Sequence, residues 1–298
     1  MDVVIVGQDH GEKMKLKIAI PVSVFLLVLS FGGFAQATKQ PPVASVLDVN
    51  GTVFVTRDGK AATLGLFDNL FVGDMIRIAK GAKLVFSHSA TKAEYRSNTS
   101  AEFEIINDGI KIKSGEAPLS KRLTELAIAA MVPSANGGRT TVGAVRMRSL
   151  TPPQTDPANR ETILTLNPEF FWPPFSPDLT YVFTLKQSGN VIIQTRTKES
   201  SARLLSTQHL EWGKEYDWTL SIAEDPDKPA VVRSFKTILK SALDEIMAMT
   251  PAESAEFSDW VVYAKTLEKA GAFAGARDVW RRLAKARPGI QELETLAK

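Results

Sequence analysis

Short runs of alternating hydrophobic and polar residues fill the chain between residues 43 and 113, and turn residues separate the runs. Ala101–Ile106 and Ile110–Lys113 are two such runs, and Asn107-Asp108-Gly109 between them has the composition of a hairpin turn. Asn50-Gly51 is a second dipeptide suited to a hairpin. Because a period of two indicates half-buried strands, this region is predicted to form an antiparallel β roll or sandwich.

The period of two returns in the second half of the chain, over residues 161–239. The expected strands are Ile163–Leu166, Thr180–Gln187, Val191–Thr195, Tyr216–Ala223 and Val231–Phe235. Their alternation of apolar and polar residues predicts half-buried β-strands.

Near the C-terminus the hydrophobic spacing becomes helical. Thr250-Pro251-Ala252-Glu253 combines an N-cap residue, a proline and a capping-box glutamate, so a helix is predicted to begin there. Gly271 is expected at the turn between two helices, and Ser241–Met249 is expected to form a helix before them. One helical hairpin cannot bury its whole apolar surface, so it needs cover from that preceding helix, from the strands of residues 161–239 or from a partner.

Residues 118–160 are mixed in character. Helical spacing between two prolines is found at Leu119, Leu123, Leu126, Ala127 and Ala130. Thr140–Arg148 is expected to form a strand. The proline-rich segment that follows predicts a stiff linker and a domain boundary over residues 151–160.

The N-terminal segment resembles an export signal. Lys15 and Lys17 precede an uncharged apolar run, Ile18–Phe34, and Ala35-Gln36-Ala37 places small residues where a signal peptidase requires them. We therefore expect residues 1–37 to be a signal peptide, with Met14 as the true start and Thr38 as the mature N-terminus. The alternative is an uncleaved membrane anchor, because the run is just long enough to span a bilayer.

The N-terminal β region resembles the FecR domain of bacterial periplasmic proteins. The matching residues are Val49-x-Gly51-x-Val53-x-Val55-x-Arg57-x-Gly59, Leu70-x-x-Gly73-Asp74-x-Ile76, Ala82-x-Leu84-x-Phe86 and Ser97-Asn98-Thr99. The resemblance covers roughly residues 43–117. It departs from the family at Ser87-His88-Ser89-Ala90, where the family usually has Asp-Gly or a similar turn. It implies envelope sensing or scaffolding.

Two further resemblances follow along the chain. One resembles a fibronectin-III or immunoglobulin-like domain and is found in the segments Asn167-Pro168-Glu169-Phe170-Phe171-Trp172, Tyr181-x-Phe183-x-Leu185 and Leu210-x-x-Gly213-x-x-Tyr216-x-Trp218. It implies a sandwich of two sheets, in which a buried tryptophan fills the gap and a tyrosine on the penultimate strand fixes a corner. The other resembles a single tetratricopeptide repeat, and the residues with matching spacing are Trp260, Ala264, Leu267, Ala276, Trp280, Leu283 and Pro288. Both resemblances imply partner binding, and a peptide-binding groove normally needs several stacked repeats.

The composition of the chain excludes several classes of function. The chain has no cysteine, which excludes a disulfide framework, a thiolate nucleophile and a lipid-modified cysteine. Its net charge is +3 with the basic residues dispersed, which argues against nucleic acid as a partner. About 260 residues remain after a cleaved signal, enough for two or three small domains with separate cores.

Candidate catalytic and metal-binding residues are few. His88 and His209 are expected to lie in solvated loops, and two histidines are too few for a histidine-rich metal site. Ser89-Ala90-Thr91-Lys92 matches the S-x-x-K pattern of penicillin-binding enzymes, but hairpins cannot build the core helix which that serine must open. We therefore predict no catalytic residue, no metal and no cofactor.

Three arginines are the candidate contacts to a ligand or partner. Arg139 precedes the expected strand Thr140–Arg148, and Arg146 and Arg148 would project from one face of it. Two adjacent guanidinium groups could bind carboxylates or phosphates, although charges that protect an edge strand explain them equally well.

An aromatic run is the other candidate. Its members, Phe170, Phe171, Trp172 and Phe175, could form a sugar-stacking platform, but we expect them to belong to the sandwich core.

The sequence therefore predicts a mainly β protein with a small α region. The expected parts are a signal peptide (1–37), a FecR-like β domain (38–150), a linker (151–160), an immunoglobulin or fibronectin-III-like sandwich (161–239) and a tetratricopeptide-like helical region (240–298). The expected function is non-catalytic binding or scaffolding in the periplasm of a Gram-negative bacterium, with an envelope protein or cell-wall polymer as partner. The alternative is an inner-membrane-anchored transducer of the FecR type. The short segment before the apolar run argues against a transcription-regulating role, since full FecR proteins carry a cytoplasmic anti-sigma segment there.

Overall fold

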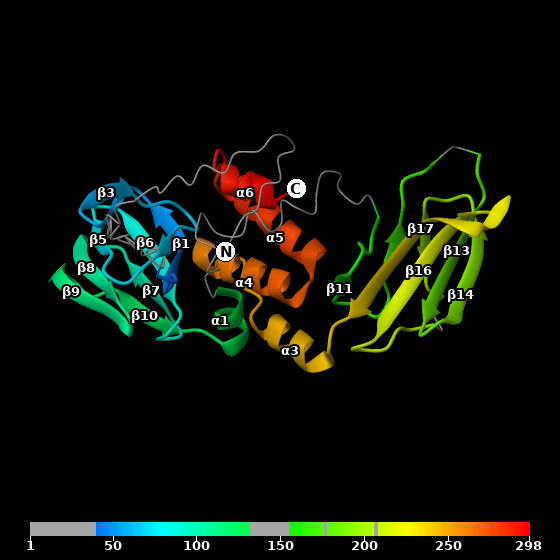
Figure 1. Ribbon diagram of the computed structural model, residues 1–298, viewed down its shortest axis with the longest axis horizontal. Coiled ribbons are helices and arrows are strands. Elements are labelled where there is room, and N and C mark those ends of the chain that lie inside the picture. The colour runs from blue at the N-terminus through cyan, green and yellow to red at the C-terminus, as the bar shows by residue number, and fades with distance from the viewer. Residues whose placement is uncertain (1–39, 132–154, 176–177, 206–207) are drawn as a thin grey trace, which may run out of the picture. The chain divides into compact units, whose positions relative to one another are not determined.

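The computed structural model describes residues 40–131, 155–175, 178–205 and 208–298 (Figure 1). Strands make up 40% of these residues and helices 22%, so the predicted mainly β class with a small α part is confirmed. All of the contacts below lie within Lys39–Lys298, which forms one unit.

The N-terminal β region consists of two five-stranded antiparallel sheets. The first has the order β10-β7-β6-β1-β4, with strands β1 (Ala44–Asn50), β4 (Asn69–Leu70), β6 (Lys83–His88), β7 (Ala93–Ser97) and β10 (Leu119–Arg122). The second has the order β3-β2-β5-β8-β9, with strands β2 (Val53–Arg57), β3 (Lys60–Thr63), β5 (Met75–Ile78), β8 (Ala101–Ile106) and β9 (Gly109–Gly115). Phe86 of the first sheet stacks on Phe103 of the second, with ring centroids 5.8 Å apart.

One of the two predicted hairpins is confirmed and the other is wrong. β8 pairs with β9 across the predicted turn, with Ile106 opposite Gly109. β1 and β2, by contrast, belong to different sheets, so Asn50-Gly51 carries the chain from one sheet to the other. Gly51 has φ +76°, and a Cβ there would lie 3.0 Å from Ala82. The dipeptide therefore marks a tight change of direction, which by itself does not determine which strands pair.

The predicted helix over residues 119–130 begins later than its spacing suggests. Leu119–Arg122 instead forms β10 and pairs with β7, with Leu119 opposite Arg96. Helix α1 covers only Glu125–Met131. The Thr124 hydroxyl accepts a hydrogen bond from the Ala127 N–H at 3.2 Å, which satisfies a backbone donor in the first turn.

The second β region is the predicted sandwich. Its larger sheet has the order β11-β17-β16-β13-β14, with strands β11 (Glu161–Ile163), β13 (Tyr181–Gln187), β14 (Asn190–Thr197), β16 (Glu215–Ile222) and β17 (Asp225–Thr237). Short strands that the sequence analysis did not predict, β12 (Glu169–Phe171) and β15 (Ser201–Arg203), form the smaller sheet. Phe170 of the smaller sheet meets Phe183 and Trp218 of the larger one, with ring centroids 4.8 and 5.9 Å apart.

Both aromatic expectations for the sandwich are confirmed. Trp172 is 2% exposed and stacks on Phe183, so it fills the space between the sheets. The hydroxyl of Tyr216, on the penultimate strand, accepts a hydrogen bond from the Glu211 N–H at 2.8 Å and fixes the corner before that strand.

The C-terminal region contains helices α3 (Lys240–Ala248), α4 (Phe257–Ala270), α5 (Phe273–Ala286) and α6 (Gln291–Leu296). Gly271 has φ +82° and ends α4, as predicted for the turn of the hairpin. The predicted helix start at Thr250 is wrong, because α4 begins at Phe257. Asp259 supplies the capping box instead, and its Oδ2 accepts from the Glu256 N–H at 3.3 Å.

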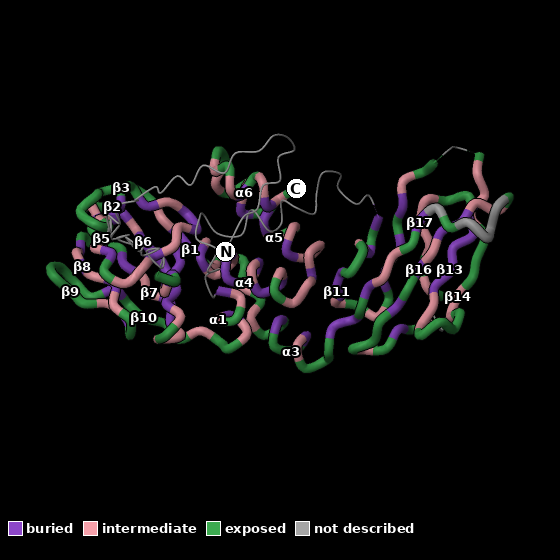
Figure 2. The backbone as a smooth tube through the Cα atoms, viewed as in Figure 1, coloured by how far each residue is buried: buried purple, intermediate pink, exposed green. Residues whose placement is uncertain are grey.

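The helices share a core with the first sheet of the N-terminal β region. Leu47 of β1 and Val85 of β6 are buried together with Val261 of α4. Phe67 meets Trp280 of α5 edge-on, with ring centroids 5.7 Å apart. Figure 2 shows β1 buried along most of its length. The hairpin is therefore covered by α3, as the sequence analysis allowed, and also by the N-terminal sheet, which it did not consider.

Candidate functional site

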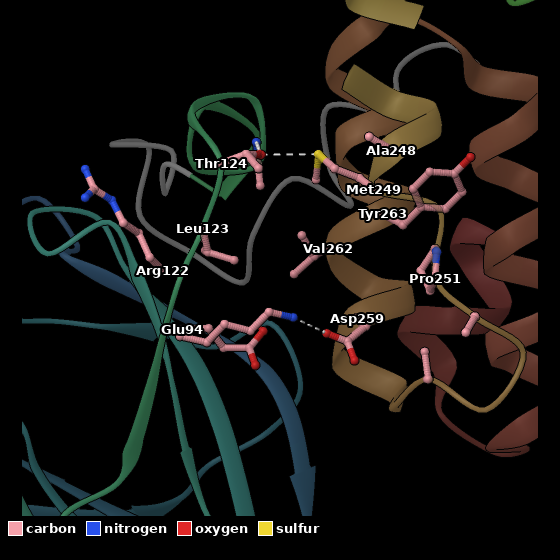
Figure 3. A pocket seen from close by; sticks show the side chains of 14 residues that line it. Glu94, Arg122, Leu123, Thr124, Ala248, Met249, Pro251, Asp259, Val262 and Tyr263 are labelled. Carbon is pink, nitrogen blue, oxygen red and sulfur yellow. Dashed lines mark hydrogen bonds and ion pairs between the residues drawn. The ribbon is translucent and has the colours of Figure 1, made fainter. Parts of the chain in front are cut away.

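A pocket of about 330 Å³ lies where the N-terminal β region meets the helices (Figure 3). One wall comes from β7, β10 and the start of α1, and the other from α4 and the loop before it. Its lining residues are Glu94, Lys121, Arg122, Leu123, Thr124, Ala127, Ala248, Met249, Pro251, Ala252, Ala255, Asp259, Val262 and Tyr263.

Apolar side chains and two short polar contacts form the upper part of this pocket. Leu123 and Val262 approach one another from opposite walls (Figure 3). The Thr124 hydroxyl contacts the Met249 sulfur at 3.2 Å across the junction. Tyr263 is held at its hydroxyl by a hydrogen bond from Thr250, at 3.2 Å. The Thr124–Met249 contact thus joins the two walls, and the Thr250 contact fixes Tyr263 within the helical wall.

The lower part of the pocket is charged. Glu94 is only 1% exposed, and its Oε1 forms an ion pair with Arg96 at 2.6 Å. Its Oε2 is buried and has no hydrogen-bond partner among the described residues. The Glu94 side chain extends from β7 towards α4 in Figure 3. A buried carboxylate oxygen without a donor is costly to retain, so its presence requires an explanation.

Ion pairs surround that carboxylate and join the two walls. Arg96 reaches Glu256 at 2.5 Å and the Ser258 hydroxyl at 3.2 Å, both at the start of α4. Lys121 of β10 pairs with Asp259 at 3.1 Å. A hydrogen bond from Lys83 is the main cause that holds the pKa of Glu256 below its usual value.

A further buried ion pair lies in the same interface. Asp48 of β1 is fully buried, and Arg287 at the end of α5 reaches it at 2.5 Å. The Arg287 guanidinium also lies 3.8 Å from the centroid of the Phe257 ring. The interface between the sheet and the helices therefore combines an apolar core with charged contacts.

A smaller pocket of about 130 Å³ lies between the sandwich and α5. Glu161 at its wall is 2% exposed and accepts hydrogen bonds from the N–H groups of Ala158 and Ala274, at 2.8 and 2.7 Å. Burial raises the pKa of Glu161. Thr162 also donates its N–H to the Gly271 carbonyl at 2.9 Å, so the sandwich is bonded directly to the helical turn.

The predicted arginine contacts cannot be placed in either pocket. Arg139, Arg146 and Arg148, together with Thr140–Arg148, lie outside the described residues. The predicted linker is described only in part, from Thr155 onward. That part packs on the sandwich, because Thr155 is buried and the Asp156 N–H donates to the Phe171 carbonyl at 3.1 Å.

His88 does not lie in a solvated loop, and this prediction is wrong. It ends β6, is 1% exposed, and its Nε2 lies 3.0 Å from the Ile106 carbonyl oxygen. Its Nδ1 accepts from the Thr91 N–H at 3.4 Å, and burial lowers its pKa. His209 is exposed as predicted and pairs with Asn167 at 3.0 Å. The apolar residues Leu84, Val85 and Phe86, which precede Ser87 and His88 in the same strand, were the sequence signal that His88 is buried.

The rejected S-x-x-K pair and the aromatic run are also placed. The Ser89 hydroxyl donates to the Val43 carbonyl at 2.8 Å, while Lys92 pairs with Glu125 at 2.8 Å. The aromatic run is divided between the core and the surface. Phe170 and Trp172 are in the sandwich core as predicted, while 44% of Phe171 and 49% of Phe175 is exposed, contrary to the prediction.

Among the described residues, no group of three or more acidic or histidine side chains could hold a metal ion. Of the helices in those ranges, none is long and apolar enough to cross a membrane. No protein-family model matches this chain, and no curated protein matches it.

Proposed function

We propose that this chain is an exported, non-catalytic binding or scaffold protein of a Gram-negative envelope, with a FecR-like domain at residues 38–150. Its partner would be an envelope protein or a cell-wall polymer. The proposal combines the signal-like segment before Thr38 with the FecR-like pattern that follows it.

The observation that carries the proposal is the pocket between the N-terminal sheets and the helices. The two parts bury a common core, yet at their edge they leave about 330 Å³ lined by apolar and charged side chains. Such a mixture of apolar walls and a few placed polar groups is typical of ligand and peptide sites. The ion pairs beside it hold both walls in position, which reduces the entropy lost on binding.

The localisation part of the proposal is tested by the mature N-terminus. The protein is purified from fractionated envelopes and sequenced from its first residue. We expect Thr38 as the first residue and recovery from the periplasmic fraction. A chain that retains Lys15 and remains with the inner membrane would contradict export by cleavage and favour the membrane-anchored transducer.

The binding part is tested by site-specific crosslinking in intact cells. A photoreactive residue is placed at Arg122, on the pocket rim, and at Lys198, on the sandwich beyond β14. We expect a discrete crosslinked product from position 122 and none of the same size from position 198. Equal labelling at both positions would contradict a binding role for the pocket.

A further inference from the structure

We infer that the pocket binds a lysine side chain of a partner polypeptide, with acidic residues beside that lysine meeting the pocket rim. The inference rests on the proposed binding function and specifies the ligand class of the same site. Its starting point is Glu94, whose Oε2 is buried at the pocket wall without a hydrogen-bond donor among the described residues.

The ion pairs at the pocket floor leave one carboxylate oxygen without a donor among the described residues. Glu94 already shares Arg96 with Glu256, which Arg96 contacts at 2.5 Å, and Asp259 lies 3.8 Å from the same guanidinium. Lys121 pairs with Asp259 and Lys83 pairs with Glu256, so three cations face these three carboxylates. The Oε2 of Glu94 is the acceptor that these pairs leave without a donor, and an added ammonium group would supply it with a charge-assisted hydrogen bond.

The geometry favours an ammonium group over a guanidinium. Glu94 Oε1 is taken by Arg96, and Asp259 binds Lys121 through Oδ1 and the Glu256 N–H through Oδ2. The single carboxylate oxygen that remains suits a compact ammonium, whereas the planar fork of arginine needs two acceptors. The apolar walls at Leu123, Met249 and Val262 would cover the aliphatic stem of a lysine.

The rim carries the opposite charge from the floor. Lys121 has 65% of its side chain exposed, and Arg122 is exposed beside it. Lys121 would pair with an acidic group adjacent to the bound lysine as well as with Asp259, whereas the Arg122 side chain points away from the pocket (Figure 3). The expected motif is therefore a lysine with an aspartate or glutamate beside it in an extended segment.

Three matched peptides test the inference on the purified chain from Thr38 onward. They are acetyl-Asp-Lys-Asp-amide, the same peptide with norleucine, and the same peptide with trimethyllysine. Norleucine removes the ammonium group, while trimethyllysine keeps the charge and removes its N–H donors. Isothermal titration gives the affinity, and the methyl NMR signals of Leu123, Met249 and Val262 locate the binding.

We expect the lysine peptide to bind at least tenfold more tightly than either analogue and to shift those methyl signals. Glu94→Gln should abolish this preference, whereas the matched control Glu104→Gln, at an ion pair with Lys113 in the other sheet, should retain it. Ala252→Phe should block the pocket from its exposed loop, and Ser254→Phe in the same loop should not. These loop variants keep the test decisive if Glu94→Gln does not fold.

Three results would overturn the inference: equal binding of all three peptides, methyl shifts elsewhere, or no binding at all. Because the titration uses purified protein, its failure leaves the envelope location and the crosslinking result untouched. Conversely, a retained N-terminal anchor would leave the titration result standing.

Discussion

Trp280 is buried in the apolar core that the C-terminal helices share with the N-terminal sheet. Its ring is 1% exposed and meets Phe67 edge-on, and its Nε1 donates to Glu268 at 2.9 Å. Trp260, by contrast, is partly exposed, with the Arg282 guanidinium 3.9 Å from its ring centroid. The two tryptophans occupy corresponding positions of the repeat-like pattern but have different environments.

Truncation should separate these two environments. We expect Trp280→Ala to lower the free energy of unfolding by about 3–5 kcal/mol, because it opens a cavity in the core and leaves Glu268 without its donor. Trp260→Ala should cost about 1 kcal/mol, as expected for a surface cation–π contact. Urea unfolding of both variants measures the difference, and a Trp280→Ala protein as stable as the wild type would contradict the buried position.

His88 should make stability depend on pH. As a neutral ring it donates to Ile106 through Nε2 and accepts from Thr91 through Nδ1, and protonation removes the acceptor. Its folded-state pKa is lowered by burial, so below about 6.5 the unfolded chain binds more protons than the folded chain. Stability should therefore fall as the pH decreases through this range.

The contribution of His88 is isolated by His88→Gln, which keeps one donor and one acceptor. Thermal melts from pH 7.5 to 5.5 should show a smaller loss for the variant than for the wild type. Glu161 and Glu268, whose pKa values burial raises, act in the opposite direction in both proteins. Identical pH profiles would show that the His88 ring does not titrate as described.

At the scale of elements, the Arg287–Asp48 pair connects α5 to β1. Asp48 is fully buried, so Arg287→Ala would leave a buried carboxylate with its partner removed. We expect a loss of about 2–4 kcal/mol, somewhat reduced because Arg287 is partly exposed and Lys83 lies 3.4 Å from Asp48.

Arg281→Ala is the matched control for that prediction. Arg281 lies on the same helix and pairs with Asp278, but both side chains are more than half exposed. Its removal should cost no more than about 1 kcal/mol. Equal losses for the two variants in chemical unfolding would indicate that the α5–β1 contact contributes little.

Local patterns predicted those elements whose partners are adjacent in the chain. The β8–β9 hairpin, the α4–α5 turn at Gly271 and the corner at Tyr216 all depend on residues near one another in sequence. The wrong predictions concern segments whose secondary structure depends on contacts with a part of the chain that is distant in sequence. Leu119–Arg122 has helical spacing, but the exposed edge of β7 supplies backbone partners that convert it into a strand.

The candidate site was not predictable from a motif, because its residues come from β7, β10, α1, α3, α4 and the loops between them. One signal of the shared core was present in β1, where Val46 and Leu47 are adjacent and both buried. A strand covered on both faces has a continuous hydrophobic run rather than an alternating one. That run identifies a covered sheet, while the identity of the cover depends on tertiary packing.

At the scale of the whole molecule, the sequence analysis expected domains with separate cores. The described residues show instead that the N-terminal sheet and the C-terminal helices bury one apolar cluster, although they are far apart along the chain. The sandwich has its own core and joins the helices through Glu161 and Thr162. A cut between the two β regions should therefore leave the parts bound together.

The shared core is tested most directly by cutting the chain at a protease site inserted between Pro153 and Gln154. We predict that the two fragments co-elute on size-exclusion chromatography under native conditions and melt in one transition. Trp280→Ala should weaken their association, while Trp260→Ala should leave it intact. Elution of the cut wild-type fragments as two separate folded species would contradict a core shared between the N-terminal sheet and the C-terminal helices.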